Sequence, residues 1–216
     1  GGHGRGEEAS RLAVEAAIQA FAVDGAGEAV MDRSFQDAQS TILQNQKADF
    51  RAQDMKTTLV VLHVGEDAVQ WGHIGDSRLY YFQNRKLELR TLDHSVPQML
   101  VMTGEIREKD IRGHEDRNRL LRVMGADENR LKYELAEPEL LDEHQAYLLC
   151  SDGFWELIEE RKMVETLRRS ETPEEWLGLM EREILKNGEG KDMDNYTAVG
   201  IFLGTAGKRK KFLGFF

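Results

Sequence analysis

The chain lacks the features that mark secreted, membrane-spanning or nucleic-acid-binding proteins. Cys150 is its only cysteine, so no internal disulfide can form, which agrees with a reducing compartment such as the cytoplasm. No apolar run approaches the roughly 20 residues that a helix needs to cross a bilayer, and the polar, glycine-rich start is not a signal peptide. Positive charge is scarce: 29 Lys and Arg stand against 39 Asp and Glu, a net charge of −10. A field of that sign repels nucleic acid and anionic membranes, so neither is an expected partner.

The remaining composition is that of a folded domain. The 216 residues are 40% hydrophobic and 31% charged, which fits one globular domain and excludes a disordered chain. The negative net charge is explained first by solubility, and it also suits the binding of cations. Because the chain does not begin with Met, we expect residues upstream of Gly1.

The spacing of apolar residues predicts helices first and then hairpin-linked strands. Three- and four-residue spacing predicts helices at 7–23 and 35–46. Ser95 is expected to cap a helix that Gly104 ends, and Thr172 to begin another. Further helices are predicted at 107–113, 154–158, 160–169 and 173–186. Strands are predicted at 57–64, 68–74, 79–83, 87–92, 119–124, 131–136, 145–150 and 196–203. This order indicates an α+β fold with antiparallel sheets and helices packed outside them.

Three aspartates stand where predicted strands meet turns: Asp76 in GDSR, Asp152 in SDG and Asp194 in DN. A carboxylate in such a place sits on a rigid support and points into a loop-lined cleft. Converging carboxylates suit hard divalent cations such as Mg²⁺ or Mn²⁺, which can activate water and offset phosphoryl charge. Each aspartate taken singly is also ordinary turn or helix-cap chemistry, so both interpretations stay open at this point.

Five motifs in order resemble those of bacterial PPM (type 2C) protein phosphatases. They are TTL at 57–59, HIGDSRLY at 73–80, LDHS at 92–95, LLCSDGFWELI at 148–158 and DNYTAVG at 194–200. The opening GGHGRGEEAS resembles the end of that family's first metal motif. The resemblance runs from Gly1 to about Leu203. It implies the family fold, which is α+β with two packed antiparallel sheets flanked by helices, an α-β-β-α sandwich.

The resemblance implies roles for the three aspartates. Asp152 and Asp194 match ligands of a pair of core ions, Mn²⁺ or Mg²⁺. Asp76 matches an aspartate that in bacterial members helps to hold a third, weaker ion together with the SDG aspartate. The supporting motif residues, which shape the loops, are Gly153, Asn195 and Ser77.

The resemblance also divides the chain. The phosphatase domain is expected at 1–204, with the family's variable flap at about 95–118. The basic and aromatic tail at 205–216 could dock a surface or membrane, but a frayed end is expected because chain ends are poorly ordered unless tied down.

The family's first strands have no counterpart in the chain as given. We expect the aspartate that bridges both core ions to lie three residues before Gly1, and an arginine that binds substrate phosphate to lie earlier still. A true absence of both would favour a catalytically inactive pseudophosphatase that binds a phosphoprotein or a regulatory partner.

Other polar residues have weaker claims. By resemblance His3 lies near the cleft mouth and could act as an acid, although a glycine-flanked histidine in a loop is more often a bystander. His73 is expected in the core or on a sheet face, and His94 in a structural role near the flap. Arg78 is expected to pair with a local carboxylate or carbonyl, with a phosphate contact as the alternative. Cys150 is expected to be an inert buried thiol.

The family resemblance implies a protein-serine/threonine phosphatase. Such an enzyme hydrolyses phosphoserine and phosphothreonine in proteins by metal-activated water, without a phosphoenzyme intermediate. The expected partners are phosphoprotein substrates of a cognate serine/threonine kinase, in bacterial signalling and in the cytoplasm.

Overall fold

The fold is described from a computed structural model, which describes residues 5–24, 29–127, 131–204 and 212–215. The chain divides into two units. One comprises Gly1–Asp76 with Asp93–Glu139, and the other Ser77–Leu92 with Leu140–Phe216. Each contains an antiparallel sheet with helices against it, so the predicted α+β class with two antiparallel sheets flanked by helices is confirmed. No helix of these described ranges is both long and apolar enough to cross a membrane.

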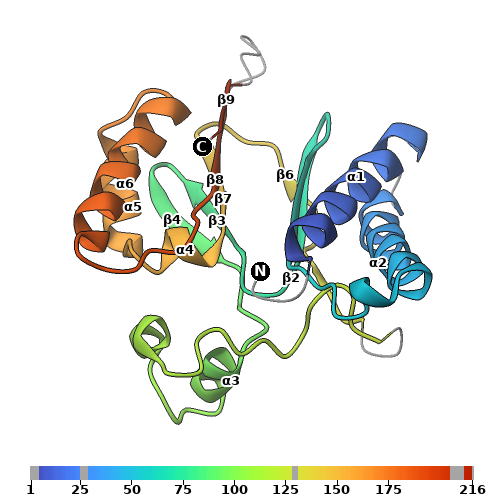
Figure 1. Ribbon diagram of the computed structural model, residues 1–216. Coiled ribbons are helices and arrows are strands. Elements are labelled where there is room, and N and C mark those ends of the chain that lie inside the picture. Colours follow the sequence, from blue (N-terminus) through green and yellow to red (C-terminus); the bar gives the residue numbers. More distant parts are fainter. Residues whose placement is uncertain (1–4, 25–28, 128–130, 205–211, 216) are drawn as a thin grey trace. The chain divides into compact units, whose positions relative to one another are not determined.

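In the first unit two long helices cover a β-hairpin. The helices α1 (Gly6–Asp24) and α2 (Val30–Ala48) lie side by side and contact β1 (Leu59–Val64) and β2 (Ala68–Ile74) (Figure 1). β5 (Glu134–Leu135) pairs with β2 on its other side, giving the order β1-β2-β5, and β6 (Glu139–Leu140) also pairs with β2.

Small side chains let the two helices approach closely. The buried residues of α1 are mainly alanines, at Ala9, Ala13, Ala17 and Ala20. Larger side chains of α2, such as Phe35 and Ile42, fill the core that these alanines leave open.

Shorter elements complete this unit. They are η1 (Phe50–Ala52), α3 (Val96–Met102) and η2 (Glu108–Gly113), of which α3 and η2 contact each other. The predicted start of α3 is confirmed, because the Ser95 side chain accepts the backbone N–H of Gln98 and a proline follows in the first turn.

The second unit is a five-stranded sheet with helices on it. Its order is β4 (Lys86–Arg90), β3 (Arg78–Gln83), β7 (Gln145–Cys150), β8 (Ala198–Leu203) and β9 (Phe212–Phe215), and every pair is antiparallel. The helices are α4 (Asp152–Trp155), α5 (Glu160–Arg168) and α6 (Pro173–Gly188). α5 and α6 lie side by side, and α6 packs on β8 and β9 (Figure 1).

Three local predictions are wrong. Residues 119–124 form no strand but take part in two isolated bridges, Ser95 with Leu120 and Thr57 with Met124. The helix predicted at 154–158 begins at Asp152 and ends at Trp155. The tail is not frayed throughout, because Phe212–Phe215 forms β9. This strand pairs with the edge of β8 whose backbone N–H and C=O groups β7 does not use.

Candidate active site

The loops of Asp152 and Asp194 meet at one end of the β7–β8 pair. The antiparallel register places the end of β7 beside the start of β8, so the chain leaving one strand runs next to the chain entering the other. The contact continues past the strands. Ser151 N–H donates to Thr197 O at 3.1 Å, and Ser151 Oγ accepts Thr197 N–H at 3.1 Å.

The absence of a side chain at Gly153 lets the two loops touch. A Cβ atom placed there would lie 2.4 Å from the carbonyl oxygen of Asn195 and 3.4 Å from Cβ of Asp194. The first distance is far inside van der Waals contact, so only glycine permits this approach. Gly153 therefore lets its own loop lie directly against the backbone of Asn195.

Both carboxylates are oriented by their own loops. Asp152 Oδ1 accepts the N–H of Gly153 at 2.9 Å, and Asp194 Oδ1 accepts the N–H of Asn195 at 2.7 Å. An ionised carboxylate has about four lone-pair sites, so one local bond leaves it able to ligate. Asp152 is half-buried and Asp194 exposed. Ser151, and not Asp152, stands at the N-cap position of α4.

A buried arginine anchors the helix that begins with Asp152. The guanidinium carbon of Arg78 lies 3.4 Å from the ring centroid of Trp155, the last residue of α4. Arg78 Nη1 donates to the Tyr80 hydroxyl at 3.1 Å and lies 3.8 Å from Glu160 Oε1. The side chain is 2% exposed, and a cation on an aromatic face is worth most when desolvated. Arg78 thus lies near a carboxylate, as predicted, but Glu160 is far along the chain from Arg78 and is not the local partner that we expected.

The Tyr80 hydroxyl completes this buried group. It donates to Glu160 Oε1 at 3.2 Å while it accepts from Arg78. Burial raises the pKa of Tyr80, so the hydroxyl stays neutral and keeps its proton for this bond. Sequence reasoning missed Tyr80, Trp155 and Glu160 as supports of the Asp152 helix. The aromatic pair after SDG was a signal that something must pack there.

Asp76 belongs to the first unit, whereas Asp152 and Asp194 belong to the second. It follows β2 and is buried, after Gly75 in a left-handed conformation with φ of 102°. The predicted supporting residue Ser77 lies just before β3. His3 lies outside the described residues, and the predicted structural role of His94 gains support from its contact with Gly75.

Comparisons with known proteins give the family. Residues 1–186 match the family model of protein phosphatase 2C. The chain is 31% identical over 178 residues to the serine/threonine phosphatase stp of Listeria monocytogenes, covering 80% of this chain and 70% of that protein. It is 28% identical over 201 residues to the serine/threonine protein phosphatase PstP of Mycobacterium tuberculosis, covering 92% of this chain and 38% of that protein. The chain therefore belongs to the protein phosphatase 2C family.

Solved structures agree with this assignment. The crystal structure of Mycobacterium tuberculosis PstP/Ppp is similar with a TM-score of 0.82 at 27% identity, covering 95% of this chain and 85% of that one. The catalytic domain of PstP in complex with two manganese ions is similar with a TM-score of 0.81 at 25% identity, covering 95% and 84%.

Proposed function

We propose that the protein is a metal-dependent serine/threonine phosphatase that hydrolyses phosphoserine and phosphothreonine in proteins. Its membership of the protein phosphatase 2C family and its identity to bacterial serine/threonine phosphatases support this activity. The main structural support is the meeting of the Asp152 and Asp194 loops at the end of the β7–β8 pair.

Asp152 and Asp194 are the proposed ligands of a core pair of ions, Mn²⁺ or Mg²⁺. The donors fit, because hard divalent cations take carboxylate oxygens and keep several waters. When bound, such ions lower the pKa of water and offset the charge of a phosphoryl group. The two manganese ions in the similar PstP structure support the same cofactor here. Asp76 stays a predicted ligand of a third ion.

The remaining residues hold the carboxylates in place. The bonds between Ser151 and Thr197 fix the spacing of the two loops, and Gly153 lets them touch. Arg78 holds Trp155, and with it the short helix that begins at Asp152. A site supported in this way needs little rearrangement when its ligand arrives.

The finer assignments follow from the same activity. Substrates are phosphoproteins, which we attribute to a cognate serine/threonine kinase. Location in the cytoplasm stays a prediction from the sequence.

The test is dephosphorylation of a phosphothreonine peptide by the full chain with Mn²⁺, with and without EDTA. We expect Mn²⁺-dependent turnover, and a loss of more than about 100-fold in the variants Asp152→Asn and Asp194→Asn, since a lost ligand costs at least as much as a lost ligand support. The matched control is Asp192→Asn, which changes an exposed aspartate two residues from Asp194 and should keep full activity.

Two results would contradict the proposal. A folded protein without Mn²⁺-dependent turnover would favour the pseudophosphatase alternative, above all if it still binds the phosphopeptide. Equal losses in the Asp192→Asn and Asp194→Asn variants would refute the ligand assignment alone.

A further inference from the structure

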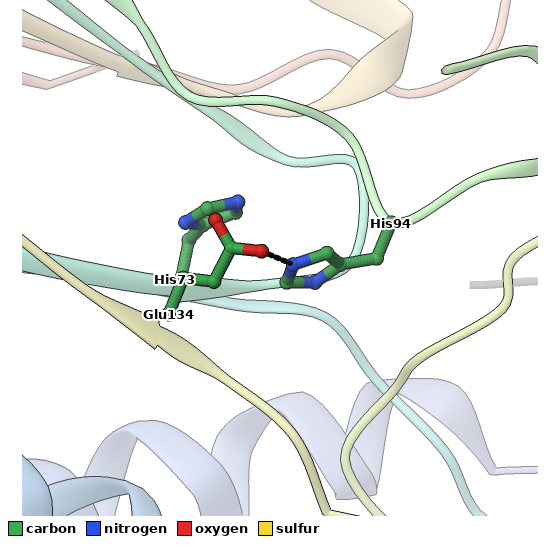
Figure 2. A group of neighbouring side chains, drawn as sticks. All are labelled: His73, His94 and Glu134. Carbon is green, nitrogen blue, oxygen red and sulfur yellow. Dashed lines mark hydrogen bonds and ion pairs between the residues drawn. The ribbon is translucent and has the colours of Figure 1, made fainter. Parts of the chain in front are cut away.

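The imidazole of His94 joins the turn before Asp76 to a glutamate on β5. Its Nδ1 lies 3.1 Å from the backbone nitrogen of Gly75. Its Nε2 lies 3.0 Å from Oε1 of Glu134, as the dashed line in Figure 2 shows. The His94 side chain is buried, whereas Glu134 is half-exposed. All of these residues belong to the first unit.

The hydrogen bonds define which nitrogen of His94 is protonated. A backbone N–H can only donate, so Nδ1 must accept from Gly75 and cannot have a proton of its own. The neutral ring therefore has its proton on Nε2 and donates it to Glu134. The same Oε1 also accepts from Arg122 Nη1 at 3.3 Å, which keeps this carboxylate ionised and an acceptor.

The ionisation states agree with this arrangement. Burial lowers the pKa of His94, although the hydrogen bond to Glu134 opposes the effect. Burial alone would raise the pKa of Glu134, but the hydrogen bond from His94 and the positive charge of Arg122 lower it. A neutral imidazole beside a carboxylate is therefore the form expected near neutral pH.

His94 holds the backbone of Gly75 at both of its polar groups. Besides the bond to Nδ1, the backbone N–H of His94 donates to Gly75 O at 2.9 Å. Gly75 has a left-handed φ, and a Cβ there would lie 2.3 Å from Cγ2 of Thr58, so the turn is closely packed as well. His94 thus bonds both backbone polar groups of the residue directly before Asp76.

A metal site is the other function that this group suggests. His73 stands opposite Glu134 in the β2–β5 pair, and its ring stacks on His94 with centroids 4.7 Å apart (Figure 2). Ligand atoms of the three residues all lie within 4.8 Å of one another. Imidazole and carboxylate together suit a transition metal.

The hydrogen bonds disfavour that metal site. Ligation through Nε2 of His94 would move the ring proton to Nδ1, where it would face the N–H of Gly75, donor against donor. Arg122 also competes for the carboxylate of Glu134. The contacts therefore favour a role in positioning.

We propose that His94, held in its Nε2–H tautomer by Glu134, is a positioning residue that fixes the Gly75 turn and so places the Asp76 carboxylate for metal binding. This inference rests on the proposed function, in which Asp76 is a metal ligand. His94 acts through Gly75 and has no contact with the reacting atoms in this role.

Two substitutions separate the functions of the two ring nitrogens. In His94→Asn the side-chain carbonyl can stand where Nδ1 stood, so the acceptor for Gly75 is kept and the bond to Glu134 is lost. In His94→Gln the amide reaches toward Glu134, so that bond is kept and the acceptor for Gly75 is lost. Both variants replace the imidazole by a carboxamide and differ only in which of the two contacts they keep. Each therefore serves as the control for the other.

The experiment measures Mn²⁺ binding by calorimetry and the Mn²⁺ dependence of phosphopeptide turnover in the full chain. We expect the Mn²⁺ midpoint of His94→Gln to rise by about 10-fold or more, since residues that orient a ligand typically contribute 10–100-fold to metal affinity. His94→Asn should stay within about 3-fold of the wild type, and kcat at saturating Mn²⁺ should change little in both. Equal midpoints in the two variants would overturn the inference.

A spectroscopic measurement covers the case in which His94→Gln does not fold. The ¹⁵N shifts of the histidine rings, with His94→Asn used to assign the His94 signals, report the tautomer directly. An Nε2–H ring supports the inference, and an Nδ1–H ring overturns it. Stoichiometric binding of Zn²⁺ to the His73 and His94 rings would also overturn it, in favour of the metal site.

The same experiments distinguish a failure of the proposed function from a failure of this inference. In that case the wild-type protein itself would neither bind Mn²⁺ nor turn over the phosphopeptide, whatever the tautomer of His94.

Discussion

The contact between Gly153 and the Asp194 loop can be tested with a single methyl group. In Gly153→Ala the new Cβ would lie 2.4 Å from the carbonyl oxygen of Asn195, where ordinary contacts begin at 3.4 Å. The neighbour is backbone, which cannot rotate away as a side chain can. The two loops must therefore separate by about 1 Å, a shift at the scale that costs catalysis about 100-fold.

Two opposing effects set the change in stability. Alanine is favoured over glycine in a helix by about 0.5–1 kcal/mol, and Gly153 lies within α4 without a left-handed φ. Overpacking a closely packed site costs about 1–3 kcal/mol. Because the clash is with backbone, the second effect wins, and we expect the free energy of unfolding to fall by about 1–2 kcal/mol.

Gly178→Ala is the matched control. Gly178 lies within α6, and a Cβ there would meet nothing within 4 Å. The same substitution should therefore stabilise the protein by about 0.5–1 kcal/mol and leave turnover unchanged. Urea unfolding, Mn²⁺ calorimetry and phosphopeptide turnover are measured for both variants. If Gly153→Ala kept the turnover and the Mn²⁺ affinity of the wild type, the reasoning that this contact determines the separation of the two carboxylate-bearing loops would be refuted.

The remaining predictions concern Arg78 and His94. Arg78→Lys loses the planar guanidinium on the Trp155 ring, so the free energy of unfolding in urea should fall by about 2 kcal/mol, and an unchanged midpoint would contradict that role. Because burial lowers the pKa of His94 despite its bond to Glu134, protonation favours the unfolded chain. Stability should then decrease as pH falls below about 6.5 and on through the lower folded pKa. His94→Asn should reduce this slope between about pH 7.5 and pH 5.5, and parallel slopes would show that other groups cause it.

Features that depend on neighbours along the chain could be predicted from the sequence. The Ser95 and Thr172 caps bond backbone N–H groups three residues later, so their signals are contained in a few residues. The β1–β2 hairpin is defined by two β-rich runs about a short turn. Strand lengths and helix ends were less accurate, because tertiary contacts decide where an element stops.

Features that depend on partners far along the chain needed the structure. Leu120 and Met124 lie in an apolar segment that resembled a strand, yet each forms only an isolated bridge. The pairing of the C-terminal strand β9 depends on the free edge of β8, which no local pattern reveals. Two partners of Arg78, Trp155 and Glu160, come from a different part of the chain, so the sequence could only indicate their type.

The site shows the same division. The sequence by itself indicated which side chains could ligate a metal. Asp76, Asp152 and Asp194 stand in short motifs that can be recognised from residue type and order alone. Only the tertiary structure showed that the loops of Asp152 and Asp194 meet, through the β7–β8 register and the missing side chain of Gly153. It alone also placed His94 against Gly75, since the hydrogen bonds of a ring depend on what surrounds it in space.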